Sequence, residues 1–322
     1  MLATQSFLKS NFVPAFVGAG GTESTVAGYK YHTYLIGDTG EFFDSLNYLD
    51  TLTIEILLVG GGGQAGSGTS GGGGAGGLIY IADFSMPDGR YTITVGAGGS
   101  GNTHVQGLGD SGSNSVITDG TRTLTAIGGG GGGGHAGSTY QMAVDGGGSV
   151  GGNAGYQSSQ TNLNTSRALT SPFAAAGGNI TTGGVTYSNV AFGNLAGIQY
   201  TGNGNGGAPG GGGAGAVGGN GVAYDTSGGG NGGAGKAIAS FNHTVWGGSS
   251  NTYYAAGGGG ANINQGNTAA SGIGGTSSSV NGSTDGSDGL ANTGSGGGGT
   301  WNHGTANGGD GGTGIVMIRY AV

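Results

Sequence analysis

The chain has 322 residues, of which 89 are glycine, and a formal net charge of −8 at pH 7. Its seven Lys and Arg residues are spread singly, so the sequence has no basic stripe that could neutralise nucleic-acid phosphates. It contains no cysteine, which excludes disulfides and thiolate metal sites, and no apolar run approaches the roughly 20 residues of a membrane helix. We therefore expect neither a nucleic-acid partner nor membrane insertion.

Glycine-rich composition by itself is typical of disorder, because glycine loses more backbone freedom on folding than any other residue. The charged fraction opposes that reading, since it is 7% where soluble domains have roughly 25%. The glycine runs offer few apolar side chains to bury. We therefore expect hydrogen bonds between the main chains of neighbouring segments to order them.

Strand signals cluster near the two ends of the chain, in short runs rich in β-branched and aromatic residues. The runs are residues 29–36, 52–59, 78–84, 91–95, 115–118, 121–127 and 315–320. Turn sequences at residues 87–89 and at Asp119-Gly120 favour antiparallel pairing. We expect an all-β protein, an antiparallel β-sandwich that the last run closes by pairing with the early strands. A short helix near residues 4–9 is the only helix expected.

The glycine tracts between these strands carry a register of three. Between residues 202 and 221, one register holds five of the eight non-glycine residues, and in residues 228–235 the only two non-glycine residues are three apart. In residues 60–77, one register is glycine except at Ala65. Three residues per turn is the period of the polyproline II helix, which lacks internal hydrogen bonds and must pair with its neighbours. We expect an inserted bundle of polyglycine II helices, in which residues 202–221 form one stiff element of roughly 60 Å. Flexible linkers are the alternative.

Three features that resemble catalytic or metal sites are weak. Residues 96–101 match a dinucleotide-binding glycine pattern, but no helical period follows them. The five histidines are dispersed, and Asp285, Asp288 and Asp310 do not form a complete calcium-binding loop. We expect no enzyme, no cofactor and no bound metal.

Long surface loops rich in Ser, Thr and Asn interrupt the tracts, at residues 138–145, 156–176, 185–201, 239–256 and 261–290. Tyrosine among small polar residues is the mixture that antibody paratopes use, so we expect these loops to recognise a partner. Half of their aromatic side chains are expected to cap the bundle instead. The candidate receptor-binding residues are Tyr140, Tyr156, Phe173, Tyr187, Tyr200, Phe241, Trp246, Tyr253 and Tyr254.

The order of strands and glycine runs resembles the glycine-rich tail-fibre and receptor-binding proteins of tailed bacteriophages. The segments that carry this resemblance are residues 29–34, 54–63, 71–80, 91–99 and 314–320. The architecture is also similar to the glycine-rich extracellular region of anaplastic lymphoma kinase. The first resemblance implies a component of the virion tail, assembled in the host cytoplasm, that binds a host cell-surface protein or glycan.

In this reading residues 1–27 are an attachment segment for other tail or baseplate proteins, and residues 28–322 form the sandwich, the bundle and the recognition loops. A homotrimer is expected from the same resemblance. Two other functions stay open. One is a structural virion decoration or spacer without a receptor, and the other is an ice-binding or matrix protein, although the tracts contain no regular row of Thr.

Overall fold

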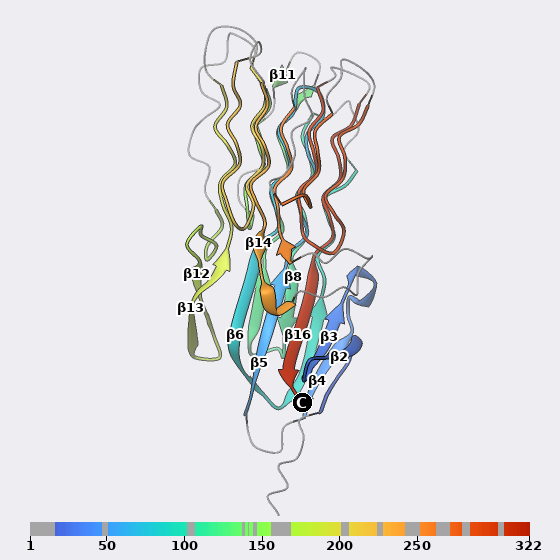
Figure 1. The fold of residues 1–322 in the computed structure, drawn as a ribbon, viewed down its shortest axis with the longest axis vertical. Coiled ribbons are helices and arrows are strands. Elements are labelled where there is room, and N and C mark those ends of the chain that lie inside the picture. Colours follow the sequence, from blue (N-terminus) through green and yellow to red (C-terminus); the bar gives the residue numbers. More distant parts are fainter. Residues whose placement is uncertain are drawn as a thin grey trace, which may run out of the picture.

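The computed structural model describes most of the chain in segments. These are residues 17–46, 51–101, 107–136, 139–140, 142–143, 147–155, 169–200, 206–223, 228–241, 252–261, 271–278, 284–301 and 306–322. Within them the protein is all-β, with antiparallel strands and two 3-10 helices of three residues each, η1 (Ile36–Asp38) and η2 (Ala239–Phe241). The sheets lie at one end of the molecule, and the glycine tracts run away from them (Figure 1).

The larger sheet has seven strands, and the end of the chain lies inside it. Its spatial order is β12 (Gly178–Thr182), β13 (Val185–Phe192), β6 (Leu78–Pro87), β5 (Thr51–Val59), β16 (Ile315–Ala321), β3 (Tyr29–Tyr34) and β2 (Thr22–Val26). The last strand, β16, is antiparallel to both β5 and β3. The prediction that the final run returns to pair with the early strands is therefore confirmed.

The second sheet has five strands, also antiparallel. Its order is β1 (Val17–Ala19), β4 (Phe42–Leu46), β7 (Gly89–Thr94), β8 (Ser115–Thr118) and β9 (Thr123–Ala126). Two further pairs lie outside the sheets, β10 (His135–Ala136) with β11 (Thr139–Tyr140) and β14 (Lys236–Ala237) with β15 (Tyr253–Tyr254). Both predicted turns are confirmed, since residue 88 joins β6 to β7 and residues 119–122 join β8 to β9.

One hydrophobic cluster draws its side chains from both sheets. In β7 the buried Tyr91 and Ile93 alternate with the partly exposed Thr92, as strand geometry requires when one face is covered. They join Ile56 of β5 and Ile318 of β16 in the same cluster. The cluster therefore joins the two sheets into one body.

The opposite face of the seven-stranded sheet is also covered. Leu57 and Met317 point to this face and join a second buried cluster with Phe241 of η2 and Tyr254 of β15. The side-chain oxygen of Tyr254 donates to the carbonyl of Phe241 at 2.9 Å. Segments that follow the glycine tracts thus close over the central strands, and this explains why those strands read as nearly continuous apolar runs.

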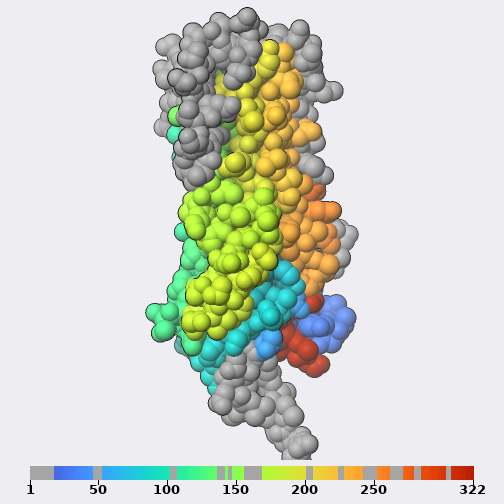
Figure 2. Space-filling view, turned by 90° about the vertical axis from the view of Figure 1, so that its left-hand side faces the viewer, coloured from blue at the N-terminus to red at the C-terminus, as the bar shows by residue number. Residues whose placement is uncertain are grey.

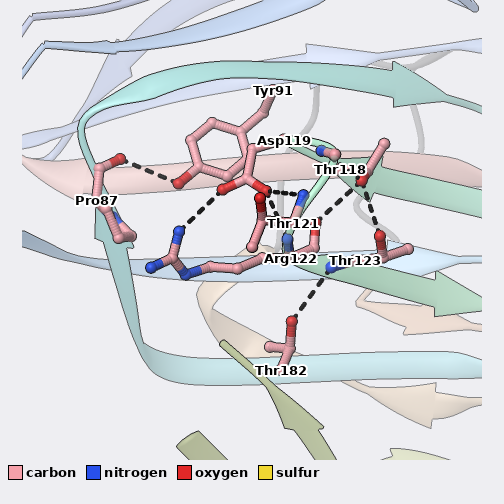
Figure 3. A network of polar contacts seen from close by, with 9 residues as sticks. Pro87, Tyr91, Thr118, Asp119, Thr121, Arg122, Thr123 and Thr182 are labelled. Carbon is pink, nitrogen blue, oxygen red and sulfur yellow. Dashed lines mark hydrogen bonds and ion pairs between the residues drawn. The ribbon is translucent and has the colours of Figure 1, made fainter. Parts of the chain in front are cut away.

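The β8–β9 turn ties the two sheets together at the end away from the tracts (Figure 3). The carboxylate of Asp119 accepts hydrogen bonds from the main-chain N–H of Thr121 at 2.8 Å and from the Arg122 guanidinium at 3.0 Å. The main-chain N–H of Thr123 donates to the hydroxyl of Thr182 at 3.2 Å. Because Thr182 belongs to β12, this bond joins the edge strands of the two sheets.

Two segments differ from expectation. Residues 185–192 were expected to begin a recognition loop, which is wrong, because they form β13 and pair with β12 and β6. Residues 17–26 fall within the expected attachment segment 1–27, yet they form β1 and β2 and pair with β4 and β3. The remainder of that segment, with the expected helix near residues 4–9, lies outside the described residues.

The central glycine tract, residues 60–67, leaves β5 and donates hydrogen bonds to three neighbouring segments in rotation. The N–H groups of Gly60 and Gly63 bond to the carbonyls of Gly77 and Gly74 at 3.0 and 2.8 Å. The next residue of each turn, Gly61 and Gln64, bonds to Ser113 and Asp110, and the third, Gly62 and Ala65, bonds to Gly312 and Gly309. Every third residue therefore faces the same neighbour.

The tract reverses at residues 67–70, where Gly68 has a φ of 78°, and returns as residues 71–77 into β6. All of residues 60–77 are buried, and a Cβ atom added at Gly73 would lie 2.0 Å from the carbonyl oxygen of Gly63. Main chain packs directly on main chain here, and only glycine allows that approach.

The expectation of one element of roughly 60 Å over residues 202–221 is wrong. The described part of this segment folds back on itself, because the N–H of Gly213 bonds to the carbonyl of Ala216, and the N–H of Gly210 to that of Gly219. Two arms therefore replace the single element. The three-residue spacing of the non-glycine residues continues on both sides of this turn. The spacing alone therefore does not reveal where the chain reverses.

Candidate functional site

The candidate recognition surface is the part of the glycine tracts farthest from the sheets. In Figure 1 the tracts extend from the sheets to the end where β11 lies. Three described features belong to this end, namely the turn at residues 67–70, Tyr200 and Trp301. Tyr200 packs against Gly206, where an added Cβ atom would lie 2.7 Å from the ring.

Trp301 was not among the predicted candidates, although it is one of only two tryptophans in the chain. It is buried in a small cluster with Ala208 and Ala261. The preceding residue, Thr300, accepts a hydrogen bond at its carbonyl from the N–H of Ser70 at 3.1 Å. Trp301 therefore lies beside the turn at residues 67–70, and its position two residues after the glycine run 296–299 was the available signal.

Four of the nine predicted contact residues are buried and pack inside the protein. Phe173 and Tyr187 belong to the cluster between the sheets, and Phe241 and Tyr254 belong to the cluster over the seven-stranded sheet. Their burial argues against a role as receptor contacts, because a buried ring has almost no surface to offer a partner. Phe241 and Tyr254 share their cluster with tract residues, and Phe173 packs against Gly77, so these three fit the capping role expected for half of the set. Tyr187 instead packs on Phe84 between the sheets.

The other five candidates differ in position. Tyr253 is 41% exposed, but it lies in β15 close to the sheets, and Tyr200 is half-buried on the tracts. Tyr140 lies in β11, for which only the backbone is described. Tyr156 and Trp246 lie outside the described residues. The structure thus does not bring the described candidates together into one surface.

One flank of the tracts is acidic. Asp285, Asp288 and Asp310 line a shallow cavity of about 330 Å³ together with Gln64 and Asn307. Burial raises the pKa of Asp310 and the carboxylate of Asp288 raises it further, although Gln64 donates a hydrogen bond to Asp310 at 2.7 Å. Two of these carboxylates already accept main-chain hydrogen bonds, Asp285 from Asn307 at 2.7 Å and Asp288 from Asp310 at 2.8 Å.

These contacts give the acidic flank a structural role. Inside the tracts, main-chain carbonyls of neighbouring segments accept the main-chain N–H hydrogen bonds. At the surface one such neighbour is absent, and short polar side chains accept these hydrogen bonds in its place. Asn220 does the same for the N–H of Ile198 at 2.8 Å, and Asn114 for that of Gly128 at 3.0 Å. Over the described residues, no group of three or more His, Cys, Asp or Glu side chains is arranged to hold a metal ion.

The described part of the chain also contains no helix with the length and apolar character needed to cross a bilayer. No curated protein matches this chain in sequence. A glycine-rich domain family matches residues 36–321, which include every named strand from β4 through β16. The chain therefore belongs to the glycine-rich domain family.

Proposed function

We propose that this protein is a viral tail fibre or receptor-binding protein that attaches the virion to a host cell-surface protein or glycan. In this proposal the two sheets form a β-sandwich, and the glycine tracts are polyglycine II helices inserted into it. The bundle acts as a rigid spacer that holds recognition segments away from the sheets. The protein would reside in the virion tail after assembly in the host cytoplasm, and it would contact other tail or baseplate proteins through its N-terminal segment.

The observation that carries the proposal is the central tract, residues 60–77. It is buried over its whole length, donates hydrogen bonds to three neighbours in rotation, and reverses far from the sheets. A register of three with bonds directed outward is the geometry of the polyproline II class. Such packing gives a stiff projection with little side-chain material, which suits display at its far end.

A structural spacer or decoration of the virion is the second candidate. It is favoured by the burial of Phe173, Tyr187, Phe241 and Tyr254, because four aromatic residues that could have supplied contacts are used for packing. The two functions share the same scaffold. They differ in whether the far end binds a receptor.

Binding of the purified protein to susceptible host cells, compared with receptor-deficient mutants of the same host, separates the two. Receptor binding predicts saturable adsorption to susceptible cells alone, and loss of adsorption in Tyr200→Ala with an unchanged melting temperature. Tyr253→Ala is the matched control, since Tyr253 is exposed but lies beside the sheets. Equal retention on both kinds of cell would leave the spacer function.

A further inference from the structure

Four exposed aliphatic side chains lie together on one side of the glycine tracts. They are Leu195, Ile198, Val217 and Val222, exposed by 40%, 53%, 59% and 39%. Their two tracts run side by side, because the N–H of Gly218 bonds to the carbonyl of Leu195 at 3.1 Å and that of Gly221 to Ile198 at 2.9 Å. We call these four side chains the aliphatic flank. Figure 2 looks onto the side of the molecule where these segments lie, in yellow-green and yellow.

The aliphatic flank and the acidic flank lie on opposite sides of the tracts. Hydrogen bonds join the intervening segments in the order 194–200, 217–222, 207–213, 257–261, 72–76, 294–299, 307–313 and 284–290. The first two segments carry the aliphatic flank, and the last two carry Asp285, Asp288 and Asp310. Figure 1 shows the same separation, with the yellow tracts on one side and the red tracts on the other.

The two segments that carry the aliphatic flank contain no charged side chain. The sequence contains no Asp, Glu, Lys, Arg or His between Arg167 and Asp225. Elsewhere the chain is acidic, with a formal net charge of −8. Two identical acidic chains repel each other, except where a neutral surface faces a neutral surface. Neighbouring exposed aliphatic side chains mark an interaction surface more often than scattered ones do.

We propose that the aliphatic flank binds the aliphatic flank of a second copy of this chain. A two-fold symmetric contact pairs a patch with itself, so the patch must be complementary to its own chemistry. Uncharged apolar side chains are complementary to an identical patch, whereas the acidic flank would repel a second acidic flank. A basic partner would be drawn to the acidic flank instead, and thus the neutral flank favours self-association. This contact forms a pair, and so differs from the homotrimer that the tail-fibre resemblance implies.

Sedimentation of the full chain over a concentration series reaching roughly 100 µM, where weak specific contacts are populated, tests the proposal. The wild type is expected to shift from monomer to dimer. Ile198→Glu places like charges across the contact, so its dissociation constant is expected to rise at least about tenfold. Val185→Glu is the matched control, because Val185 is 46% exposed in β13, outside the flank, and it should dimerise like the wild type.

Variants of opposite charge sharpen the test. Ile198→Lys and Ile198→Glu are each expected to be monomeric alone and to associate when mixed. Val217→Lys serves as a second disrupting change if Ile198→Glu lowers the melting temperature. A wild type that stays monomeric, a trimer formed without dimers, or equal loss of association in Val185→Glu would each overturn the pairing of like flanks.

Discussion

The carboxylate of Asp288 accepts a hydrogen bond from the main-chain N–H of Asp310, with 2.8 Å between oxygen and nitrogen. Twenty-two residues separate the two in sequence, and the same separation joins Asp285 to Asn307 one turn away. Side chains of the outer segment 284–290 thus accept hydrogen bonds from the main-chain N–H groups of the adjacent segment 307–313. On this flank the side-chain acceptors add to main-chain hydrogen bonds, such as that from the N–H of Gly289 to the carbonyl of Asp310 at 2.9 Å.

Replacing Asp288 with alanine should therefore leave the N–H of Asp310 without its acceptor. We expect a loss of about 1–2 kcal/mol in the free energy of unfolding, measured by chemical denaturation. Asp288→Asn keeps an acceptor oxygen and should lose less than half of that. Asp83→Ala is the control, because Asp83 is an exposed carboxylate on β6, and it should be nearly neutral. Equal losses in the alanine variants of Asp288 and Asp83 would contradict this role.

Glycine at position 73 is required because a carbonyl oxygen occupies the place of its side chain. A Cβ atom there would lie 2.0 Å from the oxygen of Gly63, which is main chain and cannot rotate away. We expect Gly73→Ala to cost at least about 3 kcal/mol, or to prevent folding, as judged by thermal denaturation and expression level. Gly37→Ala is the control, since no heavy atom lies within 4 Å of its Cβ position. A stable Gly73→Ala protein would show that the tracts can separate without loss.

The strands could be predicted from the sequence because side chains decide them. The alternation of Tyr91 with Thr92 reports a half-covered face directly, and the turn at Asp119 has its own chemical signature. The reversal near Ala214 carried no such signal. Glycine on both sides of the turn keeps the same register, and the bonds that hold the arms come from partners distant in sequence.

The candidate contact residues could not be sorted from the sequence for a related reason. Phe241 and Tyr253 occur in similar polar surroundings, yet one is buried against the sheet and the other is exposed. An aromatic side chain has the same apolar body in a core as at an interface, so local composition does not separate the two uses. Here β14 and β15 decide the outcome, and their pairing joins residues 236 and 254.

Arg319 links β16 to the segment that covers the seven-stranded sheet. Its guanidinium pairs with the carboxylate of Glu55 and donates to the carbonyl of Ser240 at 2.7 Å and to the hydroxyl of Tyr31 at 3.0 Å. The side chains of Arg319 and Glu55 are only 13% and 16% exposed. Removing one charge therefore leaves the other without a partner in a partly desolvated place.

We expect Arg319→Met to lower the free energy of unfolding by about 3 kcal/mol, measured in urea. The double variant with Glu55→Gln should recover part of that loss, because the unpaired carboxylate is removed. If the double variant loses as much as the sum of the two single changes, the ion pair is not what links these elements. The control is Arg90→Met, whose pair with Asp44 is solvent-exposed and should contribute little to the free energy of unfolding.

His32 should make stability depend on pH just below neutrality. The imidazole is fully buried, with Nδ1 2.8 Å from the carbonyl oxygen of Gly20 and Nε2 3.1 Å from the hydroxyl of Tyr320. Burial lowers the pKa of His32 and nearby Lys30 lowers it further, while the Gly20 carbonyl and the carboxylate of Glu23, 3.7 Å away, oppose the shift. The folded state therefore holds the neutral ring at a pH where the unfolded chain binds a proton.

The sign follows from proton counting. As pH falls below the ordinary histidine pKa of about 6.5, the unfolded state binds a proton on this histidine and the folded state does not. The free energy of unfolding therefore decreases until the pH reaches the lowered pKa of the folded state. The slope contributed by this one group cannot exceed about 1.4 kcal/mol per pH unit. Denaturation at intervals between pH 7.5 and 5, compared with His32→Gln, isolates it, since every other histidine and carboxylate is common to both proteins. We expect the wild type to lose more stability than the variant over this range. Parallel stability–pH profiles of the wild type and the variant would mean that His32 has the same proton affinity in the folded and unfolded states.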